Sequence, residues 1–149
     1  MTDDWIELLI ALLDTGARFL IVGAHALAVH GVPRGTQDLD VWIDSSPANA
    51  DLVQRALAAF GAPIDTLGIT TDDLQRPDIV IQIGAAPNRI DLLTAISGVP
   101  DFHAAWMARV EHSVRGRRLP FIGRDALVAT KRATGRTKDK GDLEALGEI

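Results

Sequence analysis

Two acidic residues at the start of an apolar strand constrain this chain more than any other feature of its sequence. The segment 38–43 (DLDVWI) has the apolar, β-branched and aromatic composition of a strand. Because side chains alternate across a strand, Asp38 and Asp40 project from one face while Leu39 and Val41 face the core. Carboxylates held side by side repel each other unless a cation lies between them, and Mg²⁺ prefers carboxylate oxygens. We therefore expect a divalent metal on this face of the strand.

A strand followed at once by a short helix precedes the acidic pair. The apolar run 19–22 (FLIV) predicts a buried strand, and Gly23 ends this strand and opens an Ala-rich helix over 24–30. A loop with several glycines and a proline then leads to the acidic strand. The backbone N–H groups at such a helix N-terminus bind anions, so this turn is a candidate phosphate site.

A third acidic residue lies inside a later apolar strand. The segments 78–83 (DIVIQI) and 89–93 (RIDLL) predict two strands, and the short turn between them predicts an antiparallel hairpin. A carboxylate such as Asp91 is costly to bury in an apolar strand unless it is paired or binds a cation. Two interpretations stay open. Asp91 either completes the metal site or forms an ion pair with Arg89 or a hydrogen bond with a backbone amide.

The rest of the chain predicts a single α+β domain over 1–149. Apolar residues at helical spacing predict helices over about 2–16, 47–61, 100–110, 123–135 and from about 138 onward. The segments 111–114 and 119–122 predict a small hairpin, and 62–77 predicts a loop with at most one helical turn. We expect a mixed, mainly antiparallel sheet flanked by helices, with a core over about 1–122 and a short C-terminal helical segment over about 123–149.

Composition excludes several other classes of protein. The chain is 47% hydrophobic and 23% charged, which is typical of a globular domain and not of a disordered one. It has no cysteine, so disulfides, thiol nucleophiles and zinc ribbons are excluded. The first residues are acidic where a signal peptide would be basic, and no apolar run approaches the about 20 residues of a membrane span. We expect a cytoplasmic protein with no membrane segment, whose net charge of −5 does not attract nucleic acid over the whole surface.

The segment 19–44 resembles the signature of the DNA polymerase β-like nucleotidyltransferase superfamily. Its closest similarity is to small bacterial enzymes of the minimal (MNT) and AbiEii-toxin type, whose pattern Gly-x-x-Arg-x-Thr-x-Asp-hydrophobic-Asp is matched by Gly31, Arg34, Thr36, Asp38, Leu39 and Asp40. Near the C-terminus, the AbiEii-like pattern of Lys, Arg and two Asp residues is resembled by Lys131, Arg136, Lys138, Asp139 and Asp142. Ala24 departs from the pattern, because the superfamily usually has Gly or Ser there and the serine hydroxyl is therefore missing.

The resemblance implies an activity and a set of site residues. Asp38, Asp40 and Asp91 would be catalytic and would hold Mg²⁺ or Mn²⁺. The implied phosphate-binding residues are Gly23, Ala24, Arg34, Thr36 and Lys131. The enzyme would transfer a nucleoside monophosphate from an NTP to an RNA, tRNA included, or to a protein hydroxyl. A cognate toxin or antitoxin protein is the implied partner, in a toxin–antitoxin or phage-defence pair.

The same residues also have structural interpretations. A lone Asp-hydrophobic-Asp pair often begins a strand at a solvent edge, Arg34 can pair with an acid, and Thr36 can brace its turn. The two histidines, His25 and His30, are five positions apart and do not share a helix face, so we expect packing or capping roles for them. Lys131 would ordinarily be a solvated side chain. If it contacts phosphate instead, Lys131→Ala should weaken NTP binding and leave folding nearly intact.

Two alternative functions stay open. A silent nucleotide-binding or regulatory module, such as an MNT-type antitoxin, is favoured by Ala24 and opposed by the three acids. An aminoglycoside adenylyltransferase shares the fold but usually needs a further helical region.

Overall fold

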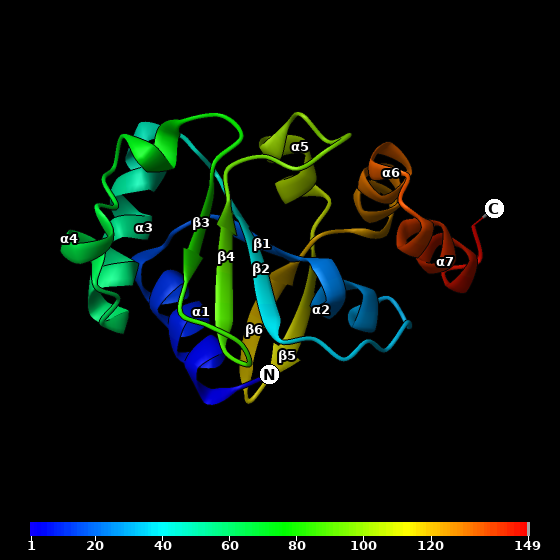
Figure 1. Cartoon of the computed structure of the whole chain (residues 1–149), viewed down its shortest axis with the longest axis horizontal. Helices are drawn as coiled ribbons and strands as arrows, with labels where there is room; N and C mark the ends of the chain where they lie inside the picture. The colour runs from blue at the N-terminus through cyan, green and yellow to red at the C-terminus, as the bar shows by residue number, and fades with distance from the viewer. Residues whose placement is uncertain (149) are drawn as a thin grey trace.

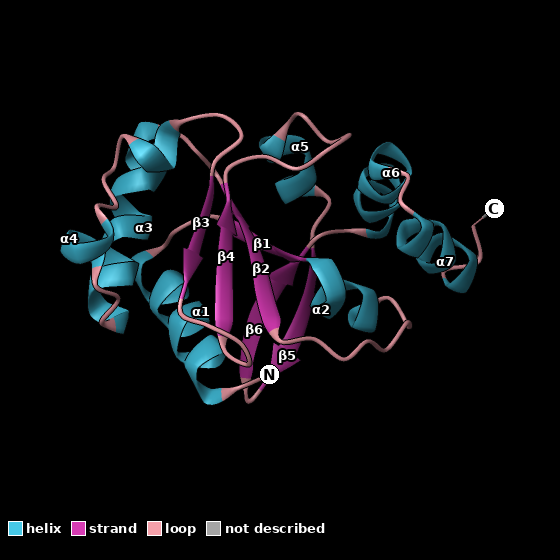
Figure 2. Cartoon of the chain, in the orientation of Figure 1, coloured by secondary structure: helices cyan, strands magenta, loops and turns pink. Residues whose placement is uncertain are grey.

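Six strands form one mixed sheet in the computed structural model, which describes residues 1–148 (Figure 1; Figure 2). The strands are β1 (Phe19–Val22), β2 (Asp38–Ile43), β3 (Val80–Ile83), β4 (Arg89–Leu93), β5 (Val110–Val114) and β6 (Arg117–Phe121). Their order across the sheet is β3-β4-β2-β1-β6-β5. The pairs β1–β2, β3–β4 and β5–β6 are antiparallel, whereas β2–β4 and β1–β6 are parallel. The predicted α+β class with a mixed, mainly antiparallel sheet is therefore confirmed.

Helices flank this sheet. They are α1 (Asp3–Thr15), α2 (Gly23–Val29), α3 (Pro47–Phe60), α4 (Ile64–Leu67), α5 (Phe102–Met107), α6 (Arg124–Thr134) and α7 (Thr137–Ala145), with a 3-10 turn, η1 (Asp73–Gln75). Two N-caps follow from the sequence: the Thr2 hydroxyl accepts from the Trp5 N–H, and the Ser46 hydroxyl accepts from the Asn49 N–H. The segment 62–77, expected to be a loop with at most one helical turn, contains α4 and η1.

The core lies between the central strands and the helices. All four residues of β1 are buried, as expected for its uninterrupted apolar sequence. The largest fully buried side chains include Trp42, Phe19 and Phe121, on three neighbouring strands. Helices α1 and α3 pack on each other, and α6 and α7 form a second pair beside α2 (Figure 1). The α6–α7 pair therefore lies next to the strand-to-helix turn that the sequence marks as a candidate phosphate site.

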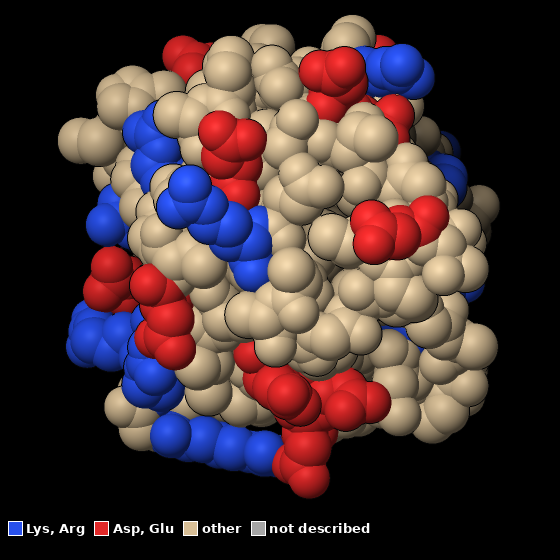
Figure 3. Space-filling model, turned by 90° about the vertical axis from the view of Figure 1, so that its left-hand side faces the viewer, with Lys and Arg blue, Asp and Glu red and all other residues tan. Residues whose placement is uncertain are grey.

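Several charged side chains on the surface are paired with side chains of opposite charge. Two basic residues at the tip of the β5–β6 hairpin contact α1, where Arg117 Nη2 lies 2.9 Å from Asp14 Oδ1 and Arg115 pairs with Asp3. On the side of the molecule that carries α3 and α4, basic and acidic residues alternate around an uncharged area (Figure 3). Within residues 1–148, no helix combines the length and the apolar character needed to cross a bilayer.

Candidate active site

The parallel pairing of β2 with β4 brings the three predicted acids to one face of the sheet. In the register of these strands, Asp40 lies opposite Asp91 and Asp38 lies opposite Arg89. Leu39, between the two acids of β2, is fully buried, which confirms the predicted alternation. We refer to Asp38, Asp40, Asp91 and Arg89 as the acidic face.

Arg89 bonds to two of the three acids. Its Nη2 donates to Asp38 Oδ2 at 2.8 Å and to Asp91 Oδ2 at 3.2 Å. The second of these contacts is the ion pair that the sequence left open for Asp91. The contact with Asp38 is not apparent from the sequence, because it depends on the register between strands far apart in the chain. The other oxygen of Asp91, Oδ1, is buried and has no hydrogen-bond partner within residues 1–148.

Asp40 is the acid of this face without an ion pair in the described part of the chain. Burial, followed by the negative charges of Asp91 and Asp38, raises the pKa of Asp40 to about 6. The Arg89 guanidinium offsets this rise only in part. The arrangement favours a proton or a cation at Asp40.

Gly23 makes room for the Asp40 carboxylate. Its φ of +70° lies in the left-handed region, and a Cβ on Gly23 would overlap Asp40 Oδ2. The glycine at the strand-to-helix turn is therefore required both by the backbone and by the close approach of the acid. Ala24 follows in α2, whose N-terminus has no side-chain cap.

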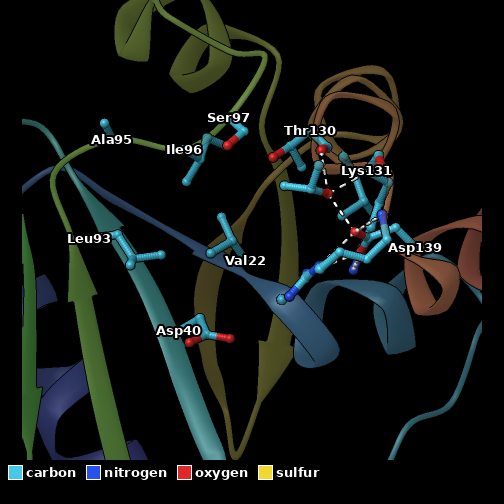
Figure 4. A pocket seen from close by; sticks show the side chains of 13 residues that line it. Val22, Asp40, Leu93, Ala95, Ile96, Ser97, Thr130, Lys131 and Asp139 are labelled. Atoms are coloured by element: carbon cyan, nitrogen blue, oxygen red, sulfur yellow. Dashed lines mark hydrogen bonds and ion pairs between the residues drawn. The ribbon is translucent and has the colours of Figure 1, made fainter. Parts of the chain in front are cut away.

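Two adjoining pockets, which we call the two chambers of one cavity, lie between β2 and α6; Asp38 and Asp40 of the acidic face are among their lining residues, and Asp91 and Arg89 are not. Both chambers are lined by Gly23, Asp40, Lys131 and Arg136. The apolar chamber, of about 360 Å³, is further lined by Val22, Leu93, Ala95, Ile96, Ser97, Leu127, Thr130, Thr134 and Asp139. The polar chamber, of about 320 Å³, is further lined by Ala24, Leu27, Arg34, Gly35, Thr36, Asp38, Lys138 and Asp142. Figure 4 shows Asp40 on one wall of the apolar chamber, with Lys131 and Asp139 on the opposite wall.

Lys131 lines both chambers, as its predicted phosphate role requires, but its charge is already matched. Its Nζ lies 3.0 Å from Asp142 Oδ2 and 3.4 Å from Asp139 Oδ1. Only 7% of Lys131 is exposed. The expectation of a solvated lysine that can be removed without affecting folding is therefore wrong, because its removal would leave two buried carboxylates short of a cation.

The two aspartates of α7 are surrounded by cations and hydrogen-bond donors. Asp139 Oδ2 accepts from the Thr134 hydroxyl at 2.6 Å and from Arg136 Nε at 2.8 Å. The bond from Arg136 is the largest cause that holds the pKa of Asp139 well below its usual range. Arg34 pairs with Asp142, so the acid-pairing interpretation of Arg34 is confirmed. We refer to Arg34, Lys131, Arg136, Asp139 and Asp142 as the helical ion cluster.

The remaining candidates from the sequence have structural roles. The Thr36 hydroxyl donates to the Asp38 carbonyl at 3.0 Å and accepts from the Asp38 N–H, so Thr36 braces its turn while also lining the polar chamber. His30 Nε2 contacts the Ile122 carbonyl at 2.8 Å. The His25 ring packs edge-on against Trp5, and burial lowers the pKa of His25. Both histidines therefore have packing or hydrogen-bonding contacts, in line with the roles expected for them.

The acidic face has the ligand chemistry of a divalent metal site, although its carboxylates do not converge on a common point. Within residues 1–148, no group of three His, Cys, Asp or Glu side chains has an arrangement that could hold a metal ion. Two observations nevertheless fit a cation: the unpartnered buried Oδ1 of Asp91 and the like charges that raise the pKa of Asp40. The metal site stays a prediction.

Two further residues of the site were not predicted to bind phosphate. Arg136 lines both chambers and Lys138 lines the polar chamber. Both residues belong to the basic run that resembles the AbiEii-like pattern near the C-terminus. This run does not by itself tell which of its cations face the cavity.

Comparison of the sequence with protein-family models and with curated proteins finds no match. Among solved structures, the chain is similar to a crystal structure from Thermotoga maritima that is described as a "putative nucleotidyltransferase". The two chains share 12% sequence identity at a TM-score of 0.61, over 97% of this chain and 93% of the other. This likeness shows a nucleotidyltransferase-like fold. The MNT or AbiEii branch stays a prediction from the sequence.

Proposed function

We propose that the protein is a metal-dependent nucleotidyltransferase that moves a nucleoside monophosphate from an NTP to an acceptor hydroxyl. The observation that carries this proposal is the cavity between the acidic face and α6, where Asp40 and Lys131 line the same two chambers. A triphosphate in a water-poor site needs positive charge on its oxygens, and this cavity is lined on one wall by acids suited to a metal and on the other by cations.

The acids divide the chemistry between them. Asp38, Asp40 and Asp91 would hold Mg²⁺ or Mn²⁺, which would neutralise the charge that develops on the leaving pyrophosphate. Asp91 would bind the second metal or accept the proton of the incoming hydroxyl, and its buried Oδ1 has no donor within residues 1–148.

The two chambers suit the two ends of a nucleotide. In the polar chamber, Lys131, Arg136 and Lys138 would contact the phosphates, with Arg34 at the same wall. The apolar chamber would take the nucleoside, since Ile96 and Leu127 offer apolar walls while Ser97 and Thr130 offer hydroxyls. The acceptor would be an RNA, tRNA included, or a protein, and the setting a toxin–antitoxin or phage-defence pair. These last assignments rest on the sequence resemblance of segments 31–40 and 131–142 to the MNT and AbiEii type.

The test is transfer of labelled nucleotide in a cell extract supplied with Mg²⁺ or Mn²⁺. Wild-type protein should label an RNA or a protein, and Asp38→Ala or Asp40→Ala should abolish the label, a loss on the order of several kcal/mol of activation free energy. Asp51→Ala is the matched control, because Asp51 is an exposed acid on α3 away from the cavity. Equal activity in the Asp40→Ala and Asp51→Ala variants would contradict the proposed role of the acidic face.

A regulatory module that binds nucleotide without turnover is the second candidate. Two observations favour it: Ala24 lacks the serine hydroxyl, and Lys131 and Arg34 are already paired with acids of α7. If wild-type protein binds nucleotide but transfers nothing with any NTP, and Ala24→Ser alone creates activity, this candidate is correct. Its partner would then be a cognate toxin.

A further inference from the structure

A guanidinium group lies within the acidic face, at the place where carboxylates from two strands meet. Arg89 projects from the same face of β4 as Asp91 and lies opposite Asp38 in the register of β2 with β4. A single nitrogen, Arg89 Nη2, is within hydrogen-bond distance of both carboxylates, at 2.8 Å and 3.2 Å. This one atom therefore bridges two acids on neighbouring strands, as a bound cation would.

The charges on this face do not balance. Three carboxylates share one guanidinium, and the carboxylate without an ion pair in the described structure, Asp40, faces the cavity. Asp91, which is 6% exposed, still has a buried oxygen, Oδ1, without a hydrogen-bond partner within residues 1–148. Such a group requires an additional donor or cation for full satisfaction.

The backbone of Arg89 is fixed while its side chain is less so. The Arg89 carbonyl accepts from Trp5 Nε1 at 3.2 Å, which ties this end of β4 to α1. The side chain of Arg89 is 35% exposed, whereas its Nε is buried and has no hydrogen-bond partner within residues 1–148. Among these residues the side chain of Arg89 donates only to the two carboxylates, and its exposed part gives the head group a route to solvent.

We propose that Arg89 is an exchangeable counter-cation: it holds Asp38 and Asp91 in position in the metal-free protein, and a divalent cation displaces it from them. Arg89 is thus a positioning residue that acts through the two acids. The proposal rests on the proposed function, because it takes the acidic face to be the metal site. It also accounts for the absence of a closed metal-binding group among the described residues, since Arg89 occupies an oxygen of two of the acids.

Exchange has two measurable consequences of opposite sign. Removing the guanidinium takes away the cation that competes with the metal, so metal affinity should rise. Removing it also leaves three carboxylates without a counter-charge, so the metal-free protein should become less stable. An ion pair that stayed in place when the metal binds would also produce the second effect, but it would raise metal affinity only through the loss of repulsion between like charges, which salt screens.

The test is Mn²⁺ binding to the full chain, measured by calorimetry without nucleotide, for wild type and Arg89→Gln. Mn²⁺ should bind the variant about tenfold more tightly, and this gain should persist at high salt, because the lost guanidinium competes for the same carboxylate oxygens and does not only repel the metal. In chelator, the melting temperature of Arg89→Gln should be lower than that of wild type. On adding Mn²⁺, the melting temperature of the variant should rise by more than that of wild type. Arg18→Gln is the matched control: Arg18 pairs with Asp44 at the other end of β2, and its side chain is 40% exposed. This control should leave Mn²⁺ affinity unchanged.

The other possible results of this test would each contradict either the exchange or the proposed function. Unchanged or weaker Mn²⁺ binding in Arg89→Gln overturns the exchange and leaves the proposed function standing, provided that wild type binds Mn²⁺. If neither protein binds Mn²⁺, the metal-dependent function itself fails and the exchange fails with it. Lost NTP binding at unchanged Mn²⁺ affinity would assign Arg89 to the substrate instead. Should Arg89→Gln not fold, Arg89→Met keeps an unbranched side chain of similar length without the charge, and the exchange requires its Mn²⁺ affinity to exceed that of wild type.

Discussion

The acidic face and the helical ion cluster are built from the same kinds of residue but differ in charge balance. The acidic face has one cation for three acids, and the pKa of Asp40 is raised to about 6. The helical ion cluster has three cations for two acids, and the pKa of Asp139 is held well below its usual range. The supply of donors around each carboxylate, and not burial alone, therefore decides whether its charge is favoured in the folded protein.

We therefore expect the helical ion cluster to contribute to stability and the acidic face, on the other side of the cavity, to contribute to function. In the helical ion cluster each buried acid has cation partners, although Asp142 Oδ2 has no hydrogen-bond partner within residues 1–148, so removal of one member should be strongly destabilising. In the acidic face the charge of Asp40 is disfavoured, and the proposed metal would relieve the repulsion between its carboxylates. Four substitutions test this contrast through the free energy of unfolding, and they are ordered by expected effect.

Asp139→Asn should cause the largest loss of stability. Asp139 is fully buried and accepts from Thr134 and Arg136 while facing Lys131, so its replacement leaves buried cations short of a partner. We expect the free energy of unfolding, measured with urea, to fall by about 3 kcal/mol. Asp51→Asn, at an exposed site on α3, should change it by less than about 0.5 kcal/mol. Similar values for the two variants would mean that the helical ion cluster is not stabilising.

Gly23→Ala should destabilise the protein by about 2 kcal/mol, because alanine at positive φ is strained and its methyl group would push Asp40 aside. The matched control is Gly141→Ala, since a Cβ at Gly141 in α7 meets no neighbouring atom. This control should be neutral or stabilising, as alanine usually is within a helix. A tolerated Gly23→Ala would remove the steric link between the glycine turn and the acidic face.

Asp40→Asn should stabilise the metal-free protein in a pH-dependent way. The pKa of Asp40 in the folded state, about 6, lies above its unfolded value. Protonation of Asp40 therefore favours folding, and this contribution is complete below the unfolded pKa and lost as the pH rises through about 6. The variant should exceed wild type by on the order of 2 kcal/mol at a pH of about 8, and the two should converge at a pH of about 4. Urea unfolding in chelator at both pH values measures this, and a difference independent of pH would contradict the raised pKa.

Arg117→Gln should have the smallest effect. Arg117 and Asp14 form an exposed pair between the β5–β6 hairpin and α1, far from the cavity in the fold. Such pairs contribute less than about 1 kcal/mol, and less still at high salt. A larger loss would indicate that surface ion pairs in this protein behave like those of the helical ion cluster.

The elements of the fold were largely predictable because their signals are local. The bounds of β1, β2 and β4 agree with the predicted strands. The glycines that end α1 and α3 are recognisable in the sequence as helix stop signals. The antiparallel β3–β4 hairpin follows from its short turn. The parallel β1–β6 pair joins residues far apart in sequence, and no local pattern indicates it.

The candidate site was predictable in its residue types and less so in its contacts. The spacing of Asp38 and Asp40 places them on one face, and the same face of β4 carries Asp91 as predicted. The sharing of Arg89 between Asp38 and Asp91 depends on strand register, which side-chain patterns do not determine between distant strands. The burial of Lys131 was missed because its partners Asp139 and Asp142 lie on the next helix, and only the packing of α6 on α7 brings them to it.

The contact between Arg34 and Asp142 joins residues 108 positions apart, and the contact between Asp38 and Arg89 joins residues 51 positions apart. Closing such long loops is slow, so both walls of the cavity should form late in folding, after local units such as the β3–β4 hairpin. A ligand that binds across the cavity can then stabilise only chains that have nearly finished folding. Nucleotide or Mn²⁺ should consequently slow the unfolding of this protein while leaving its refolding rate almost unchanged.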